Sequence, residues 1–368
     1  MQNLSMQKIL EKLISFKTIS GNYQENQKAL NWVKEQIKNL PLYIKDFKIN
    51  NFASLVITTK KTKQPIIWLQ AHMDVVSDLD KNFYSKIIGA RLYGRGAFDM
   101  KFAIACYIKL LKNFNKDLPK YNFGIMITTD EEIGGFNGTK ALLDKGFNSK
   151  IAFLPDSKSD WQFVIMSKGT WQLSIQSKGK SSHGSTPWLG KNAIEELIDF
   201  LNALRKQFPQ KHYDIKNRYD KTLNIGKISG GENANQVPDF AEVLIDIRFT
   251  TKTNKVKLEK MINLIKKKFI GIKIKEIFYH DHCKINPNNA FFKLFSKIAY
   301  DKFNIETSFG FTHGSSDAGF FLKKKIPIIV IKPKGGNIHT INEWIDLKDL
   351  EKFYIVLEDF VKKTTKID

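Results

Sequence analysis

Short apolar runs recur in the first and last parts of the chain and indicate buried strands. They read SLVIT from residue 54, IIWLQ from 66, FGIMIT from 123, IAFL from 151 and IPIIVI from 326. Residues 99–114 and 136–145, which lie between some of these runs, have apolar side chains at helical spacing. Apolar runs that alternate with helices predict an α/β domain whose sheet is mostly parallel and flanked by helices.

The middle of the chain predicts a second, smaller domain. Strand-like alternation covers residues 170–179, 222–229, 241–249 and 272–279, and helical spacing covers 192–208 and 255–269. The resulting order, βαββαβ, is typical of a two-layer sandwich. Because the first pattern resumes after residue 284, we expect an insertion at 167–282. Residues 1–166 and 283–368 would then form the two parts of the main domain.

Ionisable residues follow four of the apolar runs of the main domain. His72 and Asp74 follow IIWLQ, and three carboxylates follow FGIMIT. Asp156 follows IAFL, and His339 comes after IPIIVI and a short connection. Open α/β sheets bind ligands beyond the carboxyl ends of their strands, so we expect these side chains to converge on one site.

Three adjacent carboxylates, Asp130, Glu131 and Glu132, stand in the stretch TTDEEIGG. Adjacent carboxylates repel one another and lose hydration when they are buried. They are therefore stable together only in water or around a cation or a proton. The stretch is either a metal site or a solvated turn.

His72 and Asp74 are two residues apart in an extended segment, so their side chains share a face. A histidine bound to a metal commonly donates its other ring N–H to a carboxylate. We expect Asp74 to accept that bond from His72, which makes Asp74 a candidate catalytic residue. Asp99, in GRGAFDMK, stands where a helix begins, and taken alone this position favours a helix N-cap.

Six motifs, taken together and in this order, resemble a known enzyme family. They are AHMDVV, GRGAFDMK, TTDEEIGG, SSHGS, NANQVP with Arg248, and HTINE. Through them the chain is similar to the two-zinc amidohydrolases and peptidases. This family includes succinyl-diaminopimelate desuccinylase, acetylornithine deacetylase, aminoacylase, glutamate carboxypeptidases and bacterial dipeptidases. The resemblance runs from the first helix of the chain to the last.

The resemblance implies two zinc ions per subunit, with Co²⁺ or Mn²⁺ as alternatives. Asp99 would bridge the two ions. His72 and Asp156 would complete one metal position, and Glu132 and His339 the other. Imidazole and carboxylate ligands suit zinc, and two ions about 4 Å apart can share a water molecule.

The resemblance also implies a reaction. Glu131 would accept a proton from the shared water, which attacks an amide carbonyl, and would then protonate the leaving amine. We expect Glu132 to face the metal and Glu131 the water, because neighbours in extended chain point to opposite sides. Asp130 is expected to be structural, and the peptide bond between Asp99 and Met100 is expected to be cis.

In such a family the insertion serves as a lid and dimerisation domain. The resemblance implies a homodimer in which His183, in SSHGS, stabilises the oxyanion in the site of the partner subunit. Asn235 and Arg248 would bind a substrate carboxylate, a task that suits the paired N–H groups of arginine. The loop HGSSDAG, which contains Ser315, resembles the substrate loop of the family. Its His313 replaces the usual glycine, and its role is open.

Two features leave the substrate class open. The length and the single small insertion resemble the desuccinylases and deacetylases. Asp156, however, stands where those enzymes have glutamate, and aspartate is more usual there in aminopeptidases and dipeptidases. We expect a deacylase of small N-acyl amino acids, with hydrolysis of short peptides that have a free amino terminus as the alternative. A catalytically inactive binding protein is a third hypothesis, which the intact metal ligands and Glu131 disfavour.

The chain is strongly basic, with 59 Lys and Arg against 37 Asp and Glu and a formal charge of +22. The lysines are spread through all the predicted elements and accompany no nucleic-acid-binding motif. We therefore expect a solvated basic surface, with attraction of acidic substrates or polymers as the alternative, and no nucleic-acid partner. The stretch HDHC, residues 280–283, has ligand-type side chains at tight spacing, but without a second cluster it does not predict a separate metal site.

Three features favour a cytoplasmic protein without a membrane partner. No apolar stretch is long enough to span a membrane. The N-terminal residues lack the apolar core of a signal peptide. Cys106 and Cys283, the two cysteines, offer no disulfide framework.

Overall fold

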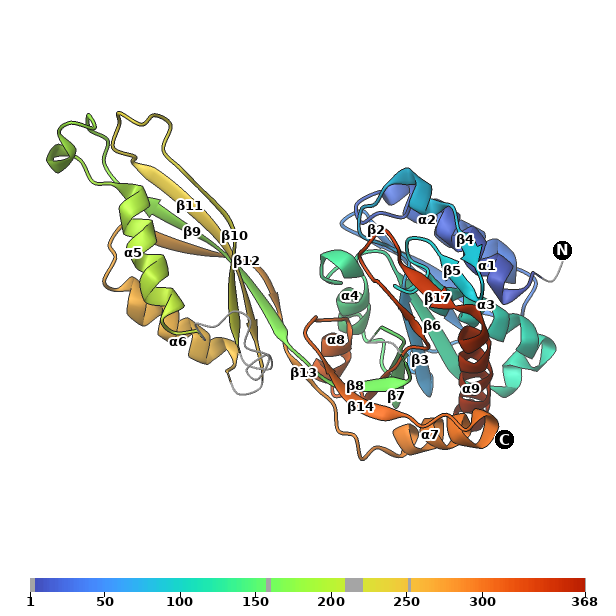
Figure 1. Cartoon of the computed structure of the whole chain (residues 1–368). Coiled ribbons are helices and arrows are strands. Elements are labelled where there is room, and N and C mark those ends of the chain that lie inside the picture. The colour runs from blue at the N-terminus through green and yellow to red at the C-terminus, as the bar shows by residue number, and fades with distance from the viewer. Residues whose placement is uncertain (1–3, 157–159, 209–220, 251–252, 368) are drawn as a thin grey trace. The chain divides into compact units, whose positions relative to one another are not determined.

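The computed structural model describes residues 4–156, 160–208, 221–250 and 253–367. The chain divides into two compact units (Figure 1). The main unit comprises Met1–Ile165, Ile285–Thr312 and Ser316–Asp368, and the inserted unit comprises Met166–Lys284 and His313–Ser315.

The first part of the main unit begins with α1 (Met6–Ser15), α2 (Tyr23–Ile37), β1 (Tyr43–Ile49), β2 (Phe52–Thr58), β3 (Ile67–His72), η1 (Asp80–Phe83), β4 (Lys86–Ile88) and β5 (Arg91–Tyr93). It continues with α3 (Lys101–Phe114), η2 (Asn115–Lys120), β6 (Phe123–Thr128), η3 (Glu131–Ile133), α4 (Thr139–Asp144), β7 (Ile151–Leu154) and β8 (Gln162–Ser167). The last two residues of β8 already belong to the inserted unit. Its second part contains α7 (Ala290–Phe303), β14 (Ser308–Thr312), α8 (Ala318–Lys323), β15 (Ile328–Val330), β16 (Gly335–Gly336), β17 (Trp344–Asp346) and α9 (Leu347–Thr365). The elements labelled η are 3-10 helices.

A six-stranded sheet forms the centre of the main unit, in the order β1-β2-β6-β3-β7-β15. β3 runs parallel to β6 and β7, and β15 runs parallel to β7. The predicted α/β class is confirmed. The SLVIT run, which we expected in the parallel part, belongs to β2, and β2 is antiparallel to both β1 and β6. Its direction follows from the two-residue turn at Asn50 and Asn51, whose positive φ angles of 48° and 71° suit a tight hairpin.

Five of the six strands of this sheet are buried over their whole length, and the edge strand β1 is exposed or partly exposed. Every residue of β2, β3, β6, β7 and β15 is buried. Helices α3 and α9 pack on β3, α2 packs on β2, and α8 packs on β15. Strands covered in this way need near-continuous apolar runs, which is the pattern that the sequence has.

The inserted unit is a two-layer sandwich. It contains β9 (Gly169–Lys178), η4 (Pro187–Leu189), α5 (Ala193–Arg205), β10 (Thr222–Gly230), β11 (Phe240–Phe249), α6 (Lys255–Lys266), β12 (Ile272–His280) and β13 (Cys283–Lys284). The sheet order is β10-β11-β9-β12 with antiparallel neighbours, and α5 and α6 lie on one face (Figure 1). Phe200 of α5 and Leu258 of α6 belong to the same apolar core as Ile245 of β11. The predicted order βαββαβ is confirmed.

In the parts of the chain that the structure describes, no helix is both long enough and apolar enough to cross a membrane.

Candidate metal centre

The carboxyl ends of the parallel strands meet at one edge of the main sheet. His72, the last residue of β3, pairs in register with Thr128, the last residue of β6. Leu154 at the end of β7 pairs with Val330 at the end of β15. The residues that follow these strands therefore emerge together, at the edge where open α/β sheets hold their ligands.

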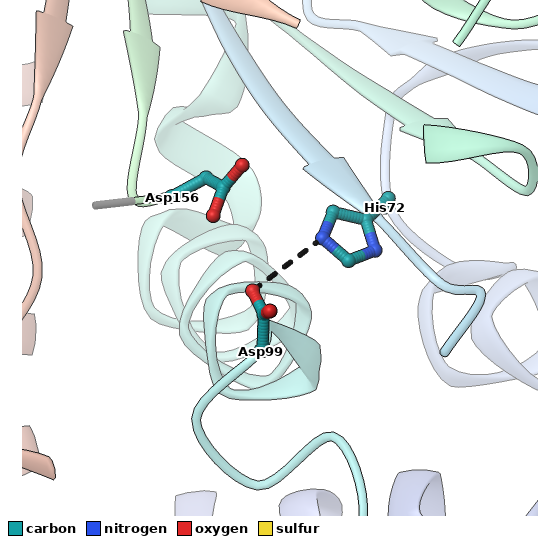
Figure 2. Close-up of side chains that lie close together, drawn as sticks. All are labelled: His72, Asp99 and Asp156. Carbon is teal, nitrogen blue, oxygen red and sulfur yellow. Dashed lines mark ion pairs between the residues drawn. The ribbon is translucent and has the colours of Figure 1, made fainter. Parts of the chain in front are cut away.

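His72, Asp99 and Asp156 form a first group of ligand-type side chains (Figure 2). One ligand atom from each lies within 4.8 Å of the others. His72 Nε2 is 3.7 Å from Asp99 Oδ1. The three residues come from the end of β3, the segment before α3 and the segment after β7. The structure therefore brings together residues that are far apart in the sequence.

Asp99, Glu132 and His339 form a second group. His339 Nε2 lies 3.2 Å from Asp99 Oδ2 and 3.1 Å from Glu132 Oε2. The bonds to Asp99 and Glu132 raise the pKa of His339 to about 10. Asp99 thus directs Oδ1 to the first group and Oδ2 to the second. The side chain of His339 is 49% exposed, whereas that of His72 is 1% exposed, so the second group is the one open to solvent.

The donor atoms of both groups fit zinc. His72 Nε2 is buried and has no hydrogen-bond partner among the described residues. The other ring nitrogen, Nδ1, lies 2.9 Å from the backbone oxygen of Asp74, so in the neutral ring Nδ1 carries the proton. Nε2 is then a free lone pair that faces carboxylates, which is the arrangement of a metal ligand.

The prediction that the Asp74 carboxylate accepts the His72 ring N–H is wrong. The backbone oxygen of Asp74 accepts it, and the carboxylate Oδ1 is 3.6 Å from Nδ1. The carboxylate has three other donors: the Ser20 hydroxyl at 2.7 Å and the backbone N–H groups of Glu131 and Glu132 at 3.2 and 3.1 Å. These bonds occupy it, and they fix the segment that carries both glutamates.

The glutamates of TTDEEIGG lie in the 3-10 helix η3, so the prediction of extended chain there is wrong. Gly134 and Gly135, both at positive φ, let the chain turn back directly after the strand. The Asp130 carboxylate closes this turn by accepting the backbone N–H groups of Asn137 at 2.7 Å and Gly138 at 3.1 Å. Burial raises the pKa of Asp130 to about 6.

The two glutamates nevertheless face different neighbours. Glu132 Oε2 is 3.1 Å from His339 Nε2, and Glu131 Oε2 is 4.0 Å from His72 Nε2. Burial, followed by the negative charge of Asp156, raises the pKa of Glu131 well above its ordinary value. A carboxyl that is only 13% exposed and has a raised pKa beside a cluster of ligands is suited to proton transfer.

Glu343, the last residue of HTINE, holds the loop that carries Asp99 in place. Because β5 pairs with β17, the loop after β5 meets the residue before β17. The Glu343 carboxylate accepts the backbone N–H groups of Gly96, Phe98 and Asp99 at 3.0, 2.8 and 2.8 Å and pairs with Arg95 at 2.8 Å. The Asp99–Met100 peptide bond is cis, as the resemblance predicts.

Lys332 also lies in the centre, although no sequence motif marks it as a site residue. It follows β15 by two residues, and its Nζ donates to Asp99 Oδ1 at 2.9 Å and Asp156 Oδ1 at 3.2 Å. Burial lowers the pKa of Lys332, but the two carboxylates outweigh burial and raise it. The stretch KPKGGN shows a lysine near a strand end, but no local signal shows that it is buried.

Asp317 is a further buried carboxylate, which its place in the loop HGSSDAG does not predict. It accepts hydrogen bonds from Gln70 Nε2 at 2.9 Å and from the Thr139 hydroxyl. Gly135 packs so closely on it that a Cβ at that position would collide with the carboxylate. Burial raises the pKa of Asp317 well above its ordinary value. Asp317 thereby ties β3, α4 and the start of α8 together.

His183 lies on an exposed loop of the inserted unit. Its Nδ1 accepts the backbone N–H of Ser185 at 3.2 Å and lies 2.7 Å from the Ser185 hydroxyl. Because Nδ1 accepts, the neutral ring carries its proton on Nε2. The Gly184 N–H donates to the backbone oxygen of Asn235 at 2.7 Å, which brings Asn235 beside the loop of His183.

Arg248 and Ser315 meet at Thr170. Arg248 Nη1 donates to Thr170 Oγ1 at 2.7 Å, and Ser315 Oγ lies 3.3 Å from the same oxygen. Arg248 Nε and Nη2 donate to Asp246 at 2.6 and 3.1 Å, which fixes the plane of the guanidinium. These bonds use three of its five N–H groups.

Within residues 4–156, 160–208, 221–250 and 253–367, the first and second groups are the sets of three ligand-type side chains that could hold a metal ion. The stretch HDHC is arranged differently. His280 Nδ1 is 3.0 Å from the backbone oxygen of Asp281, and His282 Nδ1 is 2.9 Å from the Asp281 carboxylate. Cys283 is a buried free thiol.

Comparison with known proteins gives one family and several relatives. Residues 68–363 match the model of peptidase family M20/M25/M40. The succinyl-diaminopimelate desuccinylase of Rickettsia akari is 26% identical, over 96% of this chain and 98% of that protein. The enzyme of the same name from Buchnera aphidicola subsp. Cinara cedri is 27% identical, over 76% of this chain and 77% of that protein.

Two solved structures share the fold. A tripeptidase from Staphylococcus aureus superposes with a TM-score of 0.79 at 21% identity, covering 98% of this chain and 97% of that one. An M20 family metallo-carboxypeptidase from Sulfolobus solfataricus gives a TM-score of 0.80 at 18% identity, with coverage of 98% and 99%.

Proposed function

The chain belongs to peptidase family M20/M25/M40 and is a metal-dependent amidohydrolase, and we propose that it cleaves the amide bond of small N-acyl amino acids. The observation that carries the proposal is the placement of Asp99, whose two carboxylate oxygens face the two groups of ligands. Similarity to succinyl-diaminopimelate desuccinylases over 96% of the chain supports a desuccinylase-like or deacetylase-like reaction.

The proposed cofactor is a pair of Zn²⁺ ions per subunit, with Co²⁺ or Mn²⁺ as alternatives. His72 and Asp156 would hold one ion, Glu132 and His339 the other, and Asp99 both. When bound, the ions supply a Lewis acid for the substrate carbonyl and lower the pKa of water. The imidazole and carboxylate donors of both groups support zinc.

Glu131 is the proposed general base. It accepts the proton of the attacking water and passes it to the amine nitrogen as the C–N bond breaks. Its position 4.0 Å from His72 and its raised pKa support this role. Asp74 acts as a positioning residue, because it holds the backbone N–H of Glu131 with its carboxylate and the ring of His72 with its backbone oxygen.

The inserted unit is the proposed lid and dimerisation domain of a homodimer. In this proposal His183 stabilises the oxyanion in the site of the partner subunit. Its exposure and the bond from Ser185 to Nδ1 support the role, because they leave a proton on Nε2 that can be donated outward.

Substrate binding is assigned in the same proposal to Arg248, Asn235 and Ser315. The guanidinium of Arg248 is fixed by Asp246 and Thr170 and keeps two N–H groups for a substrate carboxylate. Ser315 lies on the same Thr170 oxygen, and Asn235 lies beside the loop of His183.

Hydrolysis of short peptides with a free amino terminus is the second candidate function. The observation that favours it is Asp156, an aspartate in the first group, where deacylases of this family usually have glutamate. The relatives named as desuccinylases make it the less favoured candidate.

A cytoplasmic location also belongs to the proposal. Cys106 and Cys283 are buried free thiols, which suits a reducing compartment. Neither a membrane nor a nucleic acid is a proposed partner.

A substrate panel tests the function. Zinc-loaded protein would be assayed with N-succinyl-diaminopimelate, N-acetyl-ornithine, other N-acyl amino acids and free dipeptides. We expect cleavage of N-acylated substrates alone. Cleavage that requires a free amino terminus would select the peptidase function and would make Asp156 the informative residue.

A further inference from the structure

Lys332 contacts two of the three ligand-type side chains of the first group. Its Nζ donates to Asp99 Oδ1 and Asp156 Oδ1, at 2.9 and 3.2 Å. These two carboxylates, with His72, make up the first group. Zinc bonds such oxygens at about 2 Å. An ammonium group that already shares their negative charge competes with the ion for the same atoms and repels it.

The lysine is built into the fold. Its side chain is 0% exposed, and Nζ lies 4.9 Å from the centre of the Phe98 ring. Its backbone oxygen accepts the N–H of Trp161 at 3.1 Å. Three residues further on, Gly335 packs directly against the Phe98 ring. The backbone on both sides of Lys332 is therefore held, and the ammonium is aimed into the centre.

In the second group the two carboxylates face a histidine that is itself a member of the group. There Asp99 Oδ2 and Glu132 Oε2 face His339 Nε2, at 3.2 and 3.1 Å. Histidine is itself a metal ligand, so an ion that binds there gains His339 as a donor. The lysine ammonium has no lone pair to offer and must move away instead. The two positions therefore differ in what an ion must displace.

We propose that Lys332 competes with the metal ion of the first group, so that this chain binds its two ions unequally. One ion binds tightly at the second group. The other binds weakly at the first group, because the ammonium must leave both carboxylates before the ion can bond to them. With one ion bound, the Lys332 ammonium supplies the positive charge at the first group. The inference rests on the proposed two-metal function and deepens it.

Metal binding tests this directly. Zn²⁺ binding to the metal-free full chain would be measured by equilibrium dialysis with elemental analysis. For the wild type we expect two dissociation constants at least about tenfold apart. Lys332→Met keeps an unbranched side chain without the charge and should tighten the weaker constant by about tenfold or more. Lys334→Met, at an exposed lysine two residues away, is the matched control and should reproduce the wild-type constants.

Two equal dissociation constants for Zn²⁺ in the wild type would overturn the proposal. A weaker dissociation constant that stays unchanged in Lys332→Met would also overturn it. Circular dichroism would establish that the variant is folded. If it is not, Lys332→Gln, which also removes the charge, takes its place and should tighten the weaker dissociation constant in the same way.

The result is separable from the proposed function. Unequal constants in a protein that hydrolyses nothing on the panel would leave this inference standing and remove the function. Equal dissociation constants in an active deacylase would overturn this inference and leave the proposed function standing.

Discussion

The main sheet and the inserted sheet accommodate polar side chains differently. At the edge of the main sheet, His72, Asp74 and Asp130 are at most 1% exposed. In the inserted sheet, β11 alternates buried and partly exposed residues. Two of the partly exposed ones, Asp246 and Arg248, pair with each other at 2.6 Å.

This difference determines what each region reveals about function. Burying a charge costs free energy unless the charge is paired, so every buried group at the main edge needs a specific neighbour. The neighbours therefore indicate the chemistry. Partly exposed pairs such as Asp246 and Arg248 are stable in water without any function. Their roles depend on what they face in the working enzyme.

The largest expected effect is on catalysis at the main edge. Glu131→Gln removes the proton acceptor, so kcat should fall by about 10²–10⁴-fold. Metal content should not change, because Glu131 belongs to neither ligand group. Glu35→Gln, at a glutamate that is 62% exposed, is the control and should be as active as the wild type. A near-normal kcat for Glu131→Gln would remove it from the proposed role.

A core substitution in the inserted unit should affect stability. Phe200→Ala leaves a cavity between α5 and the sheet and should cost about 3–5 kcal/mol of unfolding free energy in urea. Ile198→Ala, on the same helix but 44% exposed, should cost about 0.5 kcal/mol or less. A similar loss in both variants would contradict the assignment of one apolar face to α5.

His183→Ala tests whether the exposed loop takes part in catalysis. Loss of the oxyanion donor should lower kcat by about 10²–10³-fold, while the unfolding midpoint and metal content stay the same. Mixing this variant with Glu131→Gln should restore part of the activity, because a mixed dimer has one site with both residues intact. Absence of any recovery in verified mixed dimers would rule out action across subunits.

The smallest expected effect concerns a surface pair of the main unit. Asp144 bonds Lys140 and Lys324, each at 2.7 Å, and these bonds lower its pKa to about 2. Because the folded pKa lies below the unfolded one, the pair stabilises the fold above pH 4 or so, and the effect disappears as the pH falls towards 2. Asp144→Asn should therefore cost a few tenths of a kcal/mol at neutral pH. An equal cost at pH 2 would contradict the assignment.

The sequence predicts much of this centre because its ligands follow apolar runs and stand in recognisable motifs. His72 is the last residue of β3 and Asp156 follows β7 by two residues, and parallel strands end at one edge. The inserted sandwich was predictable for a similar reason, since the alternation in β11 marks one buried face.

The parts that were missed depend on contacts between distant residues. Lys332 meets Asp99 across 233 positions, and Glu343 meets Asp99 across 244. Nothing in the stretch KPKGGN separates a buried lysine from a solvated one. The wrong prediction for Glu131 and Glu132 had a local cause, because Gly134 and Gly135 permit a tight turn where extended chain was assumed.

Asp99 is the residue that both proposed metal positions share, so the metal content of Asp99→Ala is the most direct measurement. The folded variant would be saturated with zinc, freed of unbound metal and analysed beside the wild type. We predict that it loses the ions of both groups together. A folded Asp99→Ala protein that retains the wild-type metal content would contradict a two-metal centre built around this carboxylate.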